Sequence, residues 1–210
     1  MEHGQRGTRP YRGIQAEDRL AQRRRQFIEA GLDLLGGQTD PDALTVRAIC
    51  ARSGLTARYF YENFADKDVF VEAVFDTVTA EMATTTEAAV SAAPPAEKNR
   101  AGISNMVRMI AEDPRIGRLM FSAQLSNAVV LRKRAEQREL FIALGGRHLQ
   151  TALRVGGGQR LRATTNFVVG GVRQAISAWL IGEVDLAEDD FVDLLVALLD
   201  DLNDPGLFRD

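Results

Sequence analysis

Residues 44–67 read LTVRAICARSGLTARYFYENFADK and contain the most informative pattern in the chain. Its apolar residues Val46, Ile49 and Cys50 are three or four positions apart, so they share one face of a short helix. Gly54 follows as a turn residue, because a residue with a Cβ atom is strained at the positive φ that a tight turn requires. A second short helix rich in Thr, Arg and Tyr follows that turn. The pattern predicts a helix-turn-helix motif.

Two threonines mark where these helices begin. Thr45 and Thr56 each stand just before a helical segment, where a side-chain oxygen can accept a backbone N–H. Leu55, Phe60 and Phe64 are expected to fill the core behind the second helix. The polar residues of that helix are then left facing outward.

The outward-facing side chains suit double-stranded DNA. An arginine such as Arg58 can donate two hydrogen bonds to a guanine, Tyr59 can contact a base edge or methyl group, and the remaining polar groups can reach phosphates. For Arg58 and Tyr59 the alternative is a solvated arginine and a packing aromatic. Arg47 and Arg52 are as well explained by solvation as by contact with the DNA backbone. The expected DNA-binding residues are Arg47, Thr56, Ala57, Arg58, Tyr59, Tyr61 and Lys67.

Charge is unevenly distributed along the chain. Residues 1–25 contain seven arginines and three acidic residues, a net charge of +4, whereas the whole chain carries −3. The other 185 residues therefore sum to −7. A basic end on an acidic body favours contact with a polyanion at that end, with a solvated tail as the alternative.

Helical periodicity continues through the rest of the chain and predicts an all-α fold. We expect a flexible basic arm at 1–15, a three-helix helix-turn-helix DNA-binding domain at 16–65, and a helical effector-binding and dimerisation domain at 66–210. The helix that Asp66 caps, running from 66 to about 90, connects the two, and the Pro94-Pro95 pair behind it favours a boundary. Further helices are expected at about 97–111, 114–125, 127–154, 162–184 and 188–202.

The helix-turn-helix of residues 45–64, with the helix before it and Lys67 after it, resembles the TetR family of bacterial transcriptional regulators. The resemblance covers about residues 18–85. It implies a homodimer that reads a roughly palindromic operator, and a divergent C-terminal domain that binds a small effector and dimerises through its last two long helices. The family's aromatic pattern occurs here as Tyr59-Phe60-Tyr61, and Asn63 stands where the family often has histidine.

The last two predicted helices are apolar on nearly all sides, in residues 167–181 and at Phe191, Val192, Leu194, Leu195, Val196, Leu198 and Leu199. Such helices are buried against their own domain and against a second chain, which favours a homodimer; a wholly internal helix is the alternative. Gly170-Gly171 within a helix predicts close approach of another helix. Residues expected on the outer face are Val168, Val172, Ala175, Trp179, Leu195 and Leu199.

Methionine and phenylalanine residues in the second half suggest a pocket for an apolar or aromatic effector, with plain core packing as the alternative. The expected ligand-binding residues, which include two polar anchors, are Met106, Met109, Phe121, Gln124, Phe141, His148 and Phe167.

Other classes of function find little support in the sequence. The single cysteine and two histidines suggest no metal site or cofactor, and no nucleophile, base and orienting group form a recognisable catalytic set. The absence of a long uncharged apolar run predicts a cytoplasmic protein without a membrane partner. We therefore expect a repressor that a small effector releases from its operator. The alternatives are an effector-independent regulator or activator controlled by a protein partner, and a helical interaction module that does not bind DNA.

Overall fold

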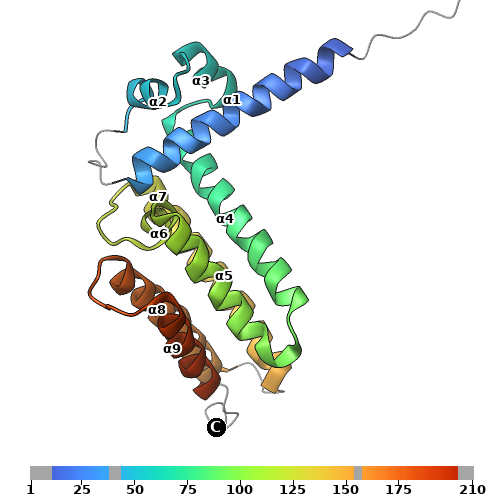
Figure 1. Cartoon of the computed structure of the whole chain (residues 1–210), viewed down its shortest axis with the longest axis vertical. Helices are drawn as coiled ribbons and strands as arrows, with labels where there is room; N and C mark the ends of the chain where they lie inside the picture. Colours follow the sequence, from blue (N-terminus) through green and yellow to red (C-terminus); the bar gives the residue numbers. More distant parts are fainter. Residues whose placement is uncertain (1–10, 38–43, 154–157, 203–210) are drawn as a thin grey trace, which may run out of the picture.

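The computed structural model describes residues 11–37, 44–153 and 158–202, and every regular element in these ranges is helical (Figure 1). The predicted all-α class is therefore confirmed. None of the described helices is both long enough and apolar enough to cross a lipid bilayer. In chain order the elements are α1 (Tyr11–Gly36), α2 (Val46–Ser53), α3 (Ala57–Asn63), α4 (Lys67–Ala92), η2 (Pro95–Glu97), α5 (Lys98–Glu112), α6 (Pro114–Phe121), α7 (Ala128–Leu153), α8 (Gln159–Leu180) and α9 (Glu188–Asp201).

Helix α1 begins earlier than its sequence pattern suggests. The predicted arm extended to residue 15, but the helix already starts at Tyr11. Residues 17–20 of α1 are exposed, so this part of the helix has no buried face that a periodic pattern could reveal. Extending an existing helix costs far less than nucleating one, and Gly13 opposes it by only about 1 kcal/mol. Residues 1–10 of the predicted arm lie outside the described residues.

Side-chain caps set the start of α2 and α4. The Thr45 hydroxyl accepts a 3.1 Å hydrogen bond from the Ala48 amide, and the Asp66 carboxylate accepts a 2.9 Å bond from Val69. Both predicted caps are confirmed. Thr56 occupies the N-cap position of α3 with extended backbone, but its side chain makes no capping bond, so that prediction was wrong.

Helices α1 to α4 enclose an aromatic core. Phe27 of α1 meets Phe60 of α3 and Phe64, the C-cap of that helix, edge to face, with ring centroids 5.7 and 6.0 Å apart, and Phe70 of α4 closes the group 5.1 Å from Phe64. The four rings are almost fully buried. Gly31 lets α1 approach α4 closely, because a Cβ atom there would lie 2.4 Å from Val74 Cγ2. This packing fixes the α2-turn-α3 unit on the connecting helix α4.

Helix α4 runs from this core into the C-terminal half, where α5 returns along it (Figure 1). The buried Asn105 of α5 donates 3.0 Å hydrogen bonds to Thr85 and Thr86 of α4. The Pro94-Pro95 pair therefore marks a turn between packed helices rather than a boundary. A division at residue 66 remains a prediction, since α4 contributes to both halves.

A second core joins α5, α8 and α9. Ile110, Ile176, Phe191 and Leu195 are buried in it, and Trp179 stacks on Phe191 at 5.1 Å with an interplanar angle of 8°. Trp179 and Leu195 therefore point inward, and Val172 and Ala175 also pack against this core, contrary to the predicted outer face. Both faces of these helices are apolar, so periodicity alone does not identify which face is internal.

The surface that α8 and α9 leave uncovered is apolar as well. Its exposed large side chains include Phe167 of α8, Ile181 at the C-cap of that helix, and Leu194 and Leu198 of α9. A Cβ atom built on Gly170 or Gly171 would meet no other atom of the described chain within 4 Å. The close approach predicted at this glycine pair is therefore not made by another described helix of the same chain.

Candidate nucleic-acid interface

The turn between α2 and α3 has the geometry expected of a helix-turn-helix. Gly54 adopts φ 70°, in the left-handed region that favours glycine. Ile49 of α2, Phe60 of α3 and Phe64 at the C-cap of α3 are buried, and Leu55 packs against this core. The core-facing predictions for this motif are confirmed, and the opposite side of α3 faces solvent.

Six of the seven predicted DNA-binding residues are exposed. They lie on α2, on α3 and its N-cap, and at the first position of α4, and they are Arg47, Thr56, Ala57, Arg58, Tyr61 and Lys67. Among the described residues Lys67 has no ion-pair partner, and the Thr56 hydroxyl makes no capping bond. These polar groups are free to reach an external partner.

Arg58 is the one cation of α3, and 84% of its side chain is accessible. Its Nε donates a 3.0 Å hydrogen bond to Glu62, one turn further along the helix. Glu62 also lies 3.6 Å from Arg23 of α1. A carboxylate thus holds the Arg58 side chain along the outer face of the helix.

Tyr59 differs from the other predicted residues, because it is half-buried and packs against the aromatic core. The guanidinium carbon of Arg23 lies 3.7 Å from the centre of its ring, which covers one ring face. Tyr61, in contrast, is 60% exposed and rests edge to face on Phe60. Of the two tyrosines, Tyr61 is the one presented to a partner.

Two arginines of α1 that we did not predict as site residues support this surface. Besides the contact of Arg23 with Tyr59, Arg24 donates a 3.2 Å hydrogen bond to the carbonyl of Asn63 and lies over Phe64. The signal was present in the sequence: Arg23 and Arg24 precede the buried Phe27 by four and three positions, which places them on the same side of the helix. Asn63 itself donates to the Tyr59 carbonyl at 2.8 Å.

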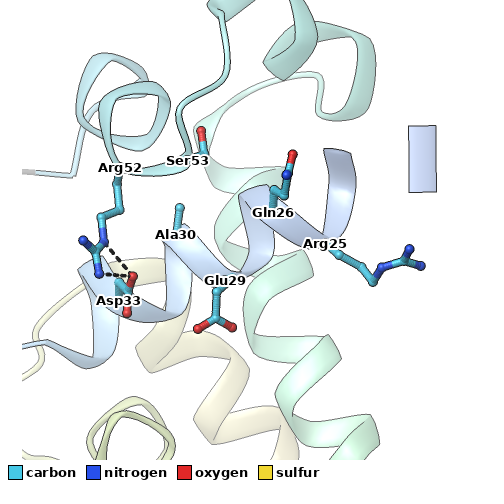
Figure 2. A pocket seen from close by; sticks show the side chains of 7 residues that line it. All are labelled: Arg25, Gln26, Glu29, Ala30, Asp33, Arg52 and Ser53. Atoms are coloured by element: carbon cyan, nitrogen blue, oxygen red, sulfur yellow. Dashed lines mark hydrogen bonds and ion pairs between the residues drawn. The ribbon is translucent and has the colours of Figure 1, made fainter. Parts of the chain in front are cut away.

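A surface hollow of about 440 Å³ lies beside the motif, where the end of α2 meets α1 (Figure 2). Arg52 borders it and is paired with Asp33 at 2.5 Å, so Arg52 has an internal partner. Asp33 also pairs with Arg115 of α6, which contacts Glu29 at 2.7 Å as well. A chain of ion pairs therefore joins α2, α1 and α6.

Cys50 packs against the core, and burial raises the pKa of its thiol. A thiol that stays protonated fits a small apolar role rather than a reactive one. Among the described residues no group of three or more metal-ligating side chains comes together.

The predicted effector residues are dispersed. Met106, Met109 and Phe121 pack against the α5, α8 and α9 core, whereas Gln124, Phe141 and Phe167 are exposed. The side chain of His148 lies outside the part of the chain that the structure describes. None of the seven lines the hollow between α1 and α2.

The four-helix packing and exposed α3 define a helix-turn-helix domain of the DNA-binding type. Residues 24–74 match the model of the family described as bacterial regulatory proteins, tetR family. The chain therefore carries the N-terminal domain of TetR-family transcriptional regulators, as its sequence predicted. No curated protein matches the chain as a relative.

Solved structures extend the similarity to the whole fold. A TetR-like transcriptional regulator from Rhodococcus sp. RHA1 is 17% identical, with a TM-score of 0.67 over 90% of this chain and 97% of that one. The fatty acid degradation regulator FadR from Bacillus halodurans gives 15% identity and a TM-score of 0.70, covering 84% and 94%. FadR from Bacillus subtilis, solved in complex with stearoyl-CoA, is 17% identical with a TM-score of 0.64. The match covers 86% of this chain and 98% of that one. The fold is that of TetR-family regulators.

Proposed function

We propose that the protein is a cytoplasmic, sequence-specific regulator that binds a palindromic DNA operator as a homodimer and acts as a repressor. Its DNA-binding residues are Arg47, Thr56, Ala57, Arg58, Tyr61 and Lys67, with Tyr59 packing behind them. The observation that carries the proposal is the exposed α3, whose Arg58 and Tyr61 project from a helix fixed by buried aromatic rings. A small effector binding to the C-terminal half would release the operator.

DNA binding follows from the division of roles on this surface. Arg58 presents a planar fork of donors, the side-chain geometry that reads guanine in the major groove. Lys67 and Thr56 suit phosphates, which fix the register of the helix without reading sequence. Arg23 and Arg24 stabilise the position of α3 from behind.

Homodimerisation is supported by the uncovered face of α8 and α9. Phe167, Ile181, Leu194 and Leu198 would be shielded from water by a second copy. The open space over Gly170 and Gly171 would admit a partner helix at short distance. Two copies are also what a palindromic operator requires, because its half-sites are related by two-fold symmetry.

An effector is supported by the neighbouring folds. Bacillus subtilis FadR was solved with stearoyl-CoA, a long apolar chain attached to an anionic group. The apolar packing of Met106, Met109 and Phe121 between helices offers a region that such a chain could enter. The alternative of a regulator without an effector is favoured by the exposure of Gln124, Phe141 and Phe167.

Selection of bound sequences from a pool of random duplexes tests the DNA-binding proposal. Wild-type protein should enrich a palindrome with half-sites about one helical turn apart, ~34 to 36 Å. The variant Arg58→Ala should lose preference at one base pair of each half-site, at a cost of about 1 to 3 kcal/mol per contact. Lys67→Ala should instead weaken binding to all sequences alike. Failure of the wild-type chain to enrich any sequence would favour the non-DNA-binding interaction module.

A further inference from the structure

Asp33 of α1 shares its carboxylate between two other helices. Its Oδ2 accepts from Nε and Nη2 of Arg52, at 2.6 and 2.5 Å, and Arg52 lies in the last turn of α2 (Figure 2). Its Oδ1 accepts from Nη1 of Arg115, in the first turn of α6. We refer to these three side chains as the Asp33 bridge. Each oxygen of one carboxylate thus holds an arginine from a different helix.

The Asp33 bridge is more enclosed than an ordinary surface ion pair. Only 19% of the Asp33 side chain and 28% of the Arg115 side chain are accessible. Arg115 also pairs with Glu29 at 2.7 Å and with Asp113 at 2.6 Å, so its guanidinium is held by several carboxylates. Isolated exposed pairs contribute little, whereas several charges in a network with good geometry do contribute. The bridge can therefore hold helices in a defined position.

Backbone packing leaves α6 little freedom beside α1. A Cβ atom on Gly36 would lie 2.4 Å from the carbonyl oxygen of Arg115, and Arg118 donates to the carbonyl of Gly36. Further along α6, a Cβ atom on Gly117 would lie 2.7 Å from Cδ2 of Leu180 in α8. Helix α6 is thus packed closely against the end of α1 and against a helix of the second core. A shift of α6 would carry Arg115 with it.

The other end of the bridge lies in the helix-turn-helix. Arg52 precedes the turn residue Gly54 by two positions, so Asp33 holds the chain just before it leaves α2 for α3. Phe60 and Phe64 attach α3 to α1 through the aromatic core. Among the described residues, the pair of Arg52 with Asp33 is the one ion pair that links α2 to another helix. The position of α2 therefore depends on Asp33.

We propose that Asp33 is a positioning residue for DNA binding, which holds α2 in a fixed relation to α6. The two ion pairs act in series, because both must be intact for α6 to hold α2 through Asp33. A motif with a fixed orientation loses less conformational freedom when it meets DNA, which strengthens binding. This role rests on the proposed function as a DNA-binding regulator, and it identifies α6 as a helix whose movement alters operator affinity.

Three single variants and their combinations test the arrangement in series. Arg52→Met, Arg115→Met and Asp33→Asn should each weaken operator binding by at least about fivefold, the lower end of the usual coupling between two sites. The double variant Arg52→Met/Arg115→Met should stay within about twofold of the weaker single variant, because one break already disconnects the helices. Neither arginine variant should weaken binding further when it is added to Asp33→Asn. Fluorescence anisotropy with the duplex selected by the wild-type protein measures each affinity.

Independent effects of the two arginines would overturn the positioning role. Losses that multiply in the double variant, or a further loss from Arg52→Met in Asp33→Asn, would show that each arginine acts alone. A direct contact of Arg52 with a phosphate would lower the slope of log affinity against log salt by about one, whereas positioning leaves the slope unchanged. Glu139→Gln removes an exposed carboxylate that is paired within α7, and as the control it should not change operator affinity.

Hydrogen–deuterium exchange without DNA separates the bridge from the proposed function. Arg115→Met should raise the exchange rate of the α2 backbone amides, since a helix that loses a tertiary contact opens more often, but should add nothing in Asp33→Asn. If Arg115→Met does not fold, Asp33→Asn alone should raise exchange in α2 and in the first turn of α6. Such a rise in a protein that binds no DNA would overturn the regulator and keep the link between α2 and α6. Operator binding with unchanged exchange in α2 would overturn the bridge and keep the regulator.

Discussion

Glu62 places a negative charge on the same helix as the side chains proposed to meet DNA. It holds Arg58 at 3.0 Å and lies 3.6 Å from Arg23, so it orients one proposed base-reading arginine while repelling phosphates. The fixed geometry favours specificity, because an oriented fork loses less side-chain entropy on binding. The repulsion opposes unspecific attraction to the polyanion.

Glu62→Gln should therefore tighten binding to random DNA. The ratio of the affinity for the operator to the affinity for random sequence should become smaller. The slope of log affinity against log salt should steepen by about one for each additional phosphate that the released arginines reach. Fluorescence anisotropy over a series of salt concentrations measures both quantities. Glu87→Gln, an exposed position near the far end of α4, is the matched control and should leave them unchanged. A larger specificity ratio in Glu62→Gln would contradict the orienting role.

The ion pair between Arg115 and Asp113 predicts that the stability of the folded state depends on pH. The hydrogen bond from Arg115 is the main cause that lowers the pKa of Asp113, and the two groups lie 2.6 Å apart. A carboxyl with a lowered pKa stabilises the folded state above its ordinary pKa of about 3.9, and this contribution is lost as pH falls through the lowered value. Arg115→Met removes it at any pH. The difference in Tm between wild type and Arg115→Met should be largest near neutral pH and shrink below about pH 4. A difference that grows on acidification would contradict the assignment.

Site residues were predictable where their signal was local. Arg58, Tyr61 and Lys67 come shortly after the turn that Gly54 marks in the sequence. All three are exposed in the structure. Tyr59 was harder to assign, because the cation that covers its ring comes from Arg23, 36 positions earlier in the chain. A composition count treats Arg23 only as part of a basic end.

At the scale of helices, the contact between α1 and α4 determines how rigidly the DNA-binding domain is attached. A methyl group on Gly31 would lie 2.4 Å from Val74 Cγ2 and 2.6 Å from Phe70 Cζ, both in a fully buried layer. Overpacking of this kind typically costs 1 to 3 kcal/mol, because close-packed neighbours cannot move without strain. Separation of these two helices would move α2 and α3 relative to the connecting helix.

Gly31→Ala should lower the free energy of unfolding by about 1 to 3 kcal/mol in a urea titration. Val74→Ala removes the methyl groups that the new Cβ would meet, so the double variant should cost less than the sum of the two single variants. The destabilisation of the double variant should fall below the sum for the single variants by more than about 0.5 kcal/mol, which is the usual scatter for independent sites. Additive effects would show that Gly31 does not contact Val74 as described.

The start of α6 was predicted correctly, but its end was not. Asp113 caps α6 as expected, with Pro114 in the first turn. The helix was expected to continue to residue 125 but ends at Phe121, where Ser122 is extended at φ −62° and ψ 126°. Its final carbonyls bond to Arg134, 12 to 16 residues further along the chain. A local pattern cannot anticipate a partner supplied by the next helix.

At the scale of the molecule, the class of fold followed from periodicity, whereas the orientation of the last helices did not. Apolar residues on both faces of α8 and α9 indicated that both faces are buried. They did not indicate which face lies in the internal core and which face meets a second copy. The stacking of Trp179 on Phe191 settles this, because it places that face of α8 in the internal core. The face available to a second copy therefore carries Phe167, Leu194 and Leu198.

Leu198→Arg and Leu194→Arg should convert the proposed dimer to a folded monomer. Each introduces a charge that a second copy would have to bury without a partner, while the internal core keeps Leu195. Sedimentation velocity at micromolar concentration measures the oligomeric state, and circular dichroism checks that the variants remain helical. Leu20→Arg, a similarly exposed leucine on α1, is the control and should stay dimeric.

Loss of the dimer should also weaken operator binding far more than any single contact. In a dimer the second α3 is held near its half-site, so its binding is effectively intramolecular, and a monomer loses that advantage. Operator affinity of Leu198→Arg should fall at least about a hundredfold, the lower end of the usual gain from linking two sites, although its own Arg58 and Lys67 are unchanged. Leu20→Arg provides the comparison in the same anisotropy assay. A Leu198→Arg protein that remains dimeric, or a monomer that binds the operator as tightly as wild type, would show that the α8 and α9 face does not pair the two reading helices.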